Sequence, residues 1–288
     1  MRYSNQARYW RQREFLRRQF LQDGKRPFAN VLSRECIDEA LGTIGACWND
    51  RIYTPVVTLW VFVIQVLSVD HSCRSAVARL VAHRVSCGLT PCSSKTGAYC
   101  RARKRLPERF FATIARNVGR QLTDQVEQQW LWKGRRVYMF DGTTISMPDT
   151  LSNQAAYPQS NRQTPGVGFP LARVAAVLSL SCGAILDLGV AAYSGKGQGE
   201  VTLLRQLWNL FQPGDVLLTD SLMCNWRNLY ELQQRGIYVV TRINKALRKA
   251  DFRKGQRLGK DDHLVDWPKP HIRDVGRKAQ LAMPRQLT

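Results

Sequence analysis

The stretch YMFDGTTISMPDT, residues 138 to 150, contains the first strand-like run of the chain. The apolar residues that open it break on Asp141, two β-branched hydroxyl residues follow, and Asp149 closes the stretch. In open α/β sheets, functional groups gather at the carboxyl ends of the strands. Asp141 is therefore a candidate functional residue at the end of a buried strand.

The residues after this stretch alternate between strand-like and helical patterns. Residues 173 to 193 predict two long strands joined by a tight turn at Ser181 to Gly183. A glycine-rich loop then leads to a helix that begins near Glu200, and DVLLTD is a short buried strand ending on Asp220. After a further helix, IYVVTRI is the fifth strand. The order β-β-β-α-β-α-β predicts a mixed α/β core.

The residues before this core have a helical pattern instead. Thr54 and Pro55 are typical of the N-cap and the first position of a helix. Its apolar run, PVVTLWVFVIQVL, is too short to span a bilayer, so no membrane partner is expected. The expected helices cover residues 34–47, 55–68, 72–86, 95–105 and 108–129.

The chain is strongly basic, with 43 Lys and Arg against 22 Asp and Glu and a formal net charge of +21. This imbalance predicts attraction to polyanions such as nucleic acids. The charge is uneven: residues 1–140 carry a net +14, residues 141–241 carry −1, and residues 242–288 carry +8. A near-neutral centre between basic arms fits an acidic active site in a protein that binds a phosphate backbone.

Asp141 and Asp220 each stand where an apolar strand stops. If the first and fourth strands are neighbours, the two carboxylates converge and repel each other unless a cation lies between them. Mg²⁺ accepts oxygen ligands from one or two carboxylates and from substrate phosphates. A second interpretation stays open, in which Asp141 begins an Asp-Gly turn and Asp220 caps the following helix.

Several stretches in order resemble a known family, the DDE transposases of bacterial insertion sequences, in the branch called insertion sequence four. The resemblance extends from about Ala98 to Pro270. It is carried by DGTTISMPDT, the GFP of GVGFPLARVAAVLSL, SGKGQGEVTLLRQLW, GDVLLTDSLMCNW and RLGKDDHLVDWPKP. It implies an RNase H-like fold, a requirement for Mg²⁺ or Mn²⁺, and cleavage and strand transfer of transposon-end DNA.

The resemblance also assigns roles to residues. Asp141 and Asp220 match the first two catalytic, metal-binding aspartates of the family. Asp149, Gly199 and Glu200 fall on positions of the family pattern, and we interpret them as structural. The expected domains are a helical DNA-binding domain (1–132), a partial RNase H-like catalytic core (133–243) and the start of a β insertion (244–288).

The third carboxylate of the family, a glutamate in a Y-x2-R-x3-E-x6-K helix, has no match here. Glu231 is the last glutamate, and it lies on the helix after Asp220, which is the wrong element. We therefore expect a truncated β insertion, no final catalytic helix, and a transposase that is inactive in this form. The alternatives are a DNA-binding regulator or inhibitor of the full-length transposase, or a non-functional remnant.

The expected partners are the terminal inverted repeats of a transposon and the target DNA, in the bacterial cytoplasm at the nucleoid. The full-length form is expected to be a homodimer. Candidate DNA-binding residues cluster in GAYCRARKRLP, residues 97 to 107, on an expected helix. They are Arg101, Arg103, Lys104 and Arg105. A solvated basic face is the alternative interpretation.

Overall fold

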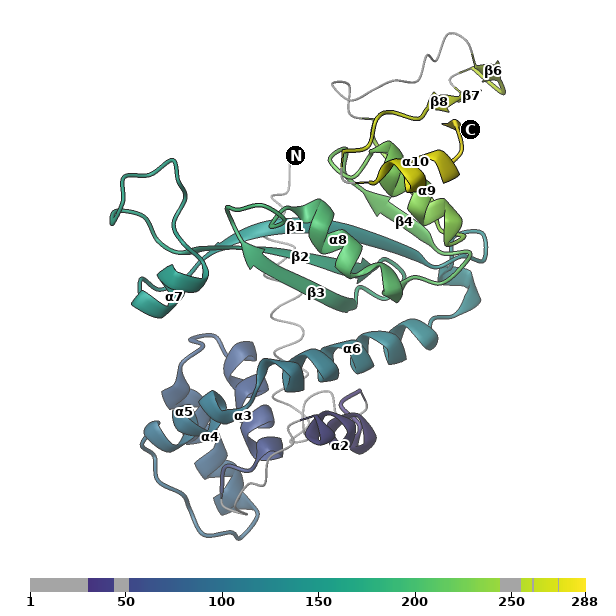
Figure 1. The fold of residues 1–288 in the computed structure, drawn as a ribbon. Coiled ribbons are helices and arrows are strands. Elements are labelled where there is room, and N and C mark those ends of the chain that lie inside the picture. The colour runs from purple at the N-terminus through teal and green to yellow at the C-terminus, as the bar shows by residue number, and fades with distance from the viewer. Residues whose placement is uncertain (1–30, 44–51, 244–254, 261, 274) are drawn as a thin grey trace, which may run out of the picture. The chain divides into compact units, whose positions relative to one another are not determined.

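The computed structural model describes residues 31–43, 52–243, 255–260, 262–273 and 275–288, and Figure 1 shows its helices and strands. The chain divides into two compact units, Met1–Val118 and Gly119–Thr288. This division falls inside α6 (Glu108–Asp124), whereas the sequence analysis put the first domain boundary after residue 132.

The first unit is helical, as expected. Thr54 Oγ1 accepts a hydrogen bond from the Val57 amide, and Pro55 is the first residue of its helix, so the predicted N-cap is confirmed. Residues 44–47 of the first expected helix lie outside the described residues, and the last expected helix ends at Asp124 rather than at 129. The helices are α2 (Arg34–Gly42), α3 (Pro55–Leu67), α4 (Cys73–Ser86), α5 (Gly97–Arg105) and α6.

Two apolar clusters hold this unit together. One joins α2, α3 and α6 through Ile37, Leu59 and Phe110. The other joins α3, α4 and α5 and includes Val77 and Tyr99, both fully buried. Burial of such side chains contributes about 1.5–3 kcal/mol each, so these clusters account for the packing of the short helices.

The second unit contains a five-stranded sheet with the strand order β3-β2-β1-β4-β5. The first three strands form an antiparallel meander, while β4 runs parallel to β1 and β5 runs parallel to β4. The strands are β1 (Val137–Ser146), β2 (Leu171–Ser179), β3 (Ile185–Ala192), β4 (Val216–Thr219) and β5 (Tyr238–Thr241). The expected mixed α/β core and its strand order in the chain are confirmed.

Two helices of this unit lie where the sequence predicts them. The helices α8 (Glu200–Gln206) and α9 (Trp226–Gln234) connect β3 to β4 and β4 to β5. Gly236, with a φ of 71°, ends the turn after α9, a conformation that favours glycine. The short helix α7 (Leu151–Ala156), between β1 and β2, was not predicted.

The two faces of the sheet differ in their burial. Successive residues of a strand point to opposite faces, and Tyr138, Phe140 and Leu217 point into a core formed with residues of α8 and α9. The alternate residues belong to the opposite face, which we call the open face. Its exposed large apolar side chains are Ile145, Ile185, Leu188, Val190, Tyr238 and Val240.

The C-terminal residues form small elements, where the sequence analysis expected the start of a β insertion. Two short antiparallel pairs are present, β6 (Gln256–Arg257) with β7 (His263–Leu264), and β8 (Trp267–Pro268) with β9 (Gln286–Leu287). The helix α10 (Arg277–Ala282) precedes β9. The Trp226 indole on α9 donates to the Trp267 carbonyl at 3.0 Å, so this segment is attached to the sheet unit. Among the described residues, no helix is long and apolar enough to cross a membrane.

Candidate active site

The register of β1 and β4 brings the two candidate aspartates to matching positions. These strands are parallel neighbours, and Met139 pairs with Leu218. Two residues further along each chain stand Asp141 and Asp220. Because neighbouring strands are about 4.8 Å apart, the two aspartates occupy adjacent positions where the parallel pairing ends.

Both aspartates belong to the open face of the sheet. Asp141 alternates with Phe140, whose ring lies in the core under α8 and α9, and so points the opposite way. Asp220 is two residues beyond Leu218, the register partner of the open-face residue Met139. Both carboxylate residues are exposed. The register therefore gives the two exposed aspartates neighbouring positions along the backbone of the strand pair.

The expectation that the first strand ends at Asp141 is wrong. β1 continues to Ser146 and stays paired with β2, with Asp141 opposite Ala176. Only the pairing with β4 ends before this residue. The β-branched residues from Thr143 to Ile145 favour the continued strand. Asp220 does follow the last residue of its strand, Thr219, as predicted.

The structure lacks the two specific contacts that the structural interpretation of these aspartates predicts. Gly142 lies within β1 and not in a turn, so Asp141 does not begin an Asp-Gly turn. The N-cap of α9 is Asn225, whose side chain accepts a hydrogen bond from the Asn228 amide at 3.0 Å. Asp220 therefore does not cap the following helix. Neither carboxylate has the purely structural role that the alternative assigned to it.

Local hydrogen bonds orient each carboxylate. Asp141 Oδ1 accepts from the Gly142 amide at 2.8 Å, and Asp220 Oδ1 accepts from the Leu222 amide at 3.0 Å. The backbone carbonyl of Asp220 accepts from Thr241 Oγ1 on β5 at 2.7 Å. Among the residues that the structure describes, no lysine or arginine forms an ion pair with either aspartate.

Residues 132–283 match the family described as the transposase DDE domain. The chain belongs to this family. No curated protein matches the chain. The match covers more than half of the sequence and includes both aspartates, and the five-stranded mixed sheet is the RNase H-like core of a DDE transposase domain.

Glu200 lies on the face of the sheet opposite to Asp141, which is the face that packs against α8 and α9. A β-carbon built on Gly142 would lie only 2.8 Å from Glu200 Cδ, so the glutamate side chain packs directly on the β1 backbone. Its carboxylate forms an ion pair with Arg173 on β2, at 3.8 Å. These contacts agree with the structural role that the sequence analysis gave to Glu200.

The other two family-pattern residues also make structural contacts. Gly199 is the N-cap of α8. Asp149 Oδ1 accepts a hydrogen bond from Gln154 Nε2 at 2.8 Å, which connects the end of the β1 segment to α7. Neither residue lies on the strand pair that carries Asp141 and Asp220.

The donor set of the aspartate pair fits a hard divalent cation. Mg²⁺ is bound through one or two carboxylates together with water and substrate phosphates, and Mn²⁺ also prefers oxygen ligands. Within the described part of the chain, no group of three or more His, Cys, Asp or Glu could hold a metal ion. The fit therefore rests on the chemistry of two exposed aspartates, Asp141 and Asp220, at neighbouring positions of the β1–β4 pair.

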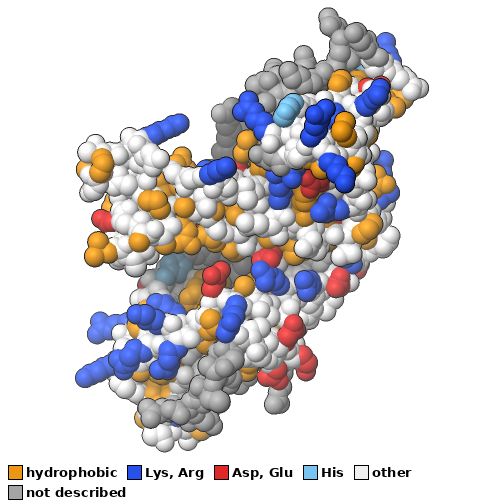
Figure 2. Space-filling model, viewed as in Figure 1, with side chains coloured by type: hydrophobic (Ala, Val, Ile, Leu, Met, Phe, Trp, Pro, Cys, Tyr) orange, Lys and Arg blue, Asp and Glu red, His pale blue; other side chains and the backbone are white. Residues whose placement is uncertain are grey.

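The basic residues of α5 divide into two kinds. Arg101, Lys104 and Arg105 are exposed. Arg103 instead donates to Gln65 Oε1 on α3 at 3.0 Å, and its guanidinium lies 5.5 Å from the Tyr99 ring centroid. Arg103 thus connects α5 to the helical core, while its three neighbours remain available to a ligand. Basic side chains gather at the lower left of Figure 2, over the helical unit that contains α4 and α5 in Figure 1.

Proposed function

We propose that this protein is a DNA transposase of a bacterial insertion sequence, of the insertion sequence four branch. Asp141 and Asp220 would hold Mg²⁺ or Mn²⁺ for cleavage and strand transfer at transposon ends. The single observation that carries this proposal is the register of β1 and β4, which makes the two aspartates neighbours on the open face. The family match supports the reaction class, and the quoted motifs support the branch.

The residues of the chain contribute orientation and access. The amides of Gly142 and Leu222 each hold one oxygen of their aspartate, which limits rotation of the carboxylates. When bound, a divalent ion would stabilise negative charge on the scissile phosphate and activate the attacking oxygen. The exposure of both aspartates leaves room for a phosphodiester backbone to approach the pair.

Metal binding tests the aspartate pair directly. We expect the full chain to bind Mn²⁺, and Asp141→Asn or Asp220→Asn to weaken binding at least tenfold, because each substitution removes a charged ligand. The measurement is a Mn²⁺ titration followed by electron paramagnetic resonance. Asp187→Asn is the matched control, because Asp187 on β3 also accepts from the next backbone amide, at 2.9 Å.

Equal Mn²⁺ affinity of Asp141→Asn, Asp220→Asn and the control Asp187→Asn would reject the proposed metal site. A second arm incubates the chain with transposon-end DNA and Mn²⁺. Because no residue of this sequence matches the third carboxylate of the family, we expect the chain to bind DNA without nicking it. Nicking that is lost in Asp141→Asn would contradict this expectation and show that the site is complete. Binding without nicking also fits a second function, a DNA-binding regulator, for which the exposed basic residues of α5 are the specific observation.

The basic helix α5 gives a prediction for DNA binding. We expect Arg101, Lys104 and Arg105 to contact phosphates, so replacing all three by Gln lowers the salt dependence of binding. The slope of log K against log salt should fall by about 0.9 for each phosphate that is no longer neutralised. Fluorescence anisotropy of labelled duplex DNA at several salt concentrations measures it. Arg162→Gln, an exposed arginine of the other unit, is the control, and an unchanged slope in the triple variant would reject the role of α5 in DNA binding.

A further inference from the structure

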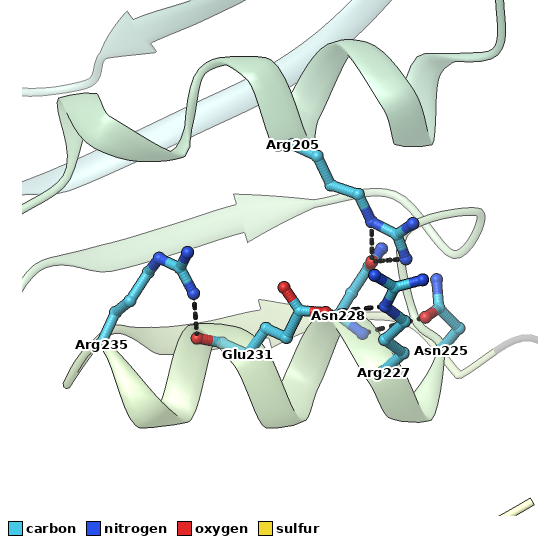
Figure 3. A network of polar contacts seen from close by, with 6 residues as sticks. All are labelled: Arg205, Asn225, Arg227, Asn228, Glu231 and Arg235. Atoms are coloured by element: carbon cyan, nitrogen blue, oxygen red, sulfur yellow. Dashed lines mark hydrogen bonds and ion pairs between the residues drawn. The ribbon is translucent and has the colours of Figure 1, made fainter. Parts of the chain in front are cut away.

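The turn that carries Asp220 is held by a buried side chain of the helix that follows it. Asn228 lies on α9 and is 1% exposed. Its Nδ2 donates to the Met223 carbonyl at 3.1 Å. Figure 3 shows Asn228 between α9 and the side chain of Arg205 from α8. Asn228 therefore connects two helices to the turn after β4.

Arg205 fixes the orientation of the Asn228 amide. Its Nε and Nη2 both donate to Asn228 Oδ1, at 3.2 and 2.9 Å. Because a guanidinium only donates, the amide oxygen must face Arg205, and the amide nitrogen is left to face Met223. Hydrogen bonds from a charged donor are stronger than those between neutral groups, so this orientation is well defined.

Met223 belongs to the same backbone turn as Asp220. The Met223 amide donates to the Asp220 carbonyl at 3.4 Å, and the intervening Leu222 amide donates to Asp220 Oδ1 at 3.0 Å. The Met223 carbonyl, which also accepts from the Asn225 amide at 2.9 Å, and the Leu222 amide that orients the carboxylate thus belong to one short turn. This chain of contacts runs from Arg205 through Asn228 to Asp220.

We infer that Asn228, oriented by Arg205, is a positioning residue that sets the affinity of Asp220 for a divalent cation. The inference rests on the proposed metal-binding function of Asp141 and Asp220. It goes beyond that function because it assigns a role to residues that do not touch the ion. Partners that orient metal ligands typically affect metal affinity or activity by about 10- to 100-fold when they are mutated.

The same helix supplies a matched control. Arg227 and Glu231 form an ion pair on α9, at 2.7 Å, and belong to the network in Figure 3. Both side chains are about a quarter exposed, and the two residues lie one turn apart along α9. A change at this pair perturbs α9 itself and leaves the Asn228 contact with Met223 intact.

Asn228→Asp is the central variant because it keeps the shape and the acceptor facing Arg205 but removes the donor to Met223. We expect its Mn²⁺ affinity, from the same resonance titration, to fall about 10- to 100-fold. Arg205→Gln is a second variant in case Asn228→Asp does not fold, with an expected loss of several fold. Arg227→Gln should bind Mn²⁺ like the unmodified chain. Thermal unfolding midpoints are measured for every variant, and titrations are done well below them.

The outcomes separate the inference from the proposed function. If Asp220→Asn loses Mn²⁺ while folded Asn228→Asp and Arg205→Gln bind it like Arg227→Gln, the positioning role is rejected and the metal site stands. If Asp220→Asn keeps its affinity, the metal site and the positioning role fail together. Support requires weakened Mn²⁺ binding in folded Asn228→Asp or Arg205→Gln, with Arg227→Gln unaffected.

Discussion

The two aspartates of the site are held in place by different means. Asp141 lies inside a ten-residue strand, paired with β2 on one side and, up to Met139, with β4 on the other. Asp220 follows a four-residue strand, and contacts from Thr241 and Asn228 hold its turn. The position of Asp141 is thus a property of the sheet, whereas that of Asp220 depends on a few side chains.

This difference predicts two kinds of failure. A change near Asp141 should disturb the sheet and lower the free energy of unfolding, because the strand backbone and the core beneath it move together. A change near Asp220 should alter the affinity for a metal ion with a smaller loss of stability, because only a turn is displaced. The following predictions test this contrast, in order of decreasing effect.

The largest effect is expected for Gly142→Val. Its side chain would overlap Glu200, whose Cδ lies 2.8 Å from a β-carbon at this position. The Glu200 side chain must move to make room and thereby gives up its ion pair with Arg173. Overpacking costs about 1–3 kcal/mol, and we expect a loss toward the lower end of this range in the free energy of unfolding, measured by urea denaturation. The double variant with Glu200→Ala should recover part of the loss, with Glu200→Ala alone as reference. A fully stable Gly142→Val would show that β1 is not constrained by this contact.

A smaller effect is expected for Thr241→Val, which removes the hydroxyl that donates to the Asp220 carbonyl at 2.7 Å. One such hydrogen bond is worth about 1 kcal/mol, and we expect Mn²⁺ affinity to fall several fold because the turn is released on one side. Urea denaturation and the Mn²⁺ titration measure the two quantities.

Thr219→Val, on the neighbouring strand β4, is the control for Thr241→Val. Its Oγ1 is buried without a hydrogen-bond partner, so valine should leave stability unchanged or raise it. If Thr241→Val lowered stability by as much as Gly142→Val and left Mn²⁺ binding unchanged, the contrast between the two aspartates would be refuted.

Much of the fold follows from local sequence patterns. The strand and helix order, the N-cap at Thr54 and the glycine after α9 were predictable because turn chemistry and apolar periodicity act over a few residues. The end of β1 was not predictable from local patterns, because the strand continues to Ser146 through its pairing with β2. That pairing joins residues distant in sequence.

The candidate site was predictable only in part for the same reason. Asp141 and Asp220 stand out because each follows an apolar run. Nothing in the sequence singles out Asn228, which reads as one polar residue of an amphipathic helix until its contacts with Met223 and Arg205 are seen. Likewise, Arg103 resembles its basic neighbours in sequence, and only tertiary structure shows that it binds Gln65.

The open face of the sheet has a consequence for the colloidal behaviour of the protein. Six large apolar side chains of the described strands are exposed there, in a chain whose formal net charge is +21. At low ionic strength, mutual repulsion keeps the copies apart. At 1 M salt the Debye length is only about 3 Å, so this repulsion is screened while the attraction between apolar faces remains. We therefore expect added salt to weaken the proposed binding to DNA and at the same time to promote self-association of the protein.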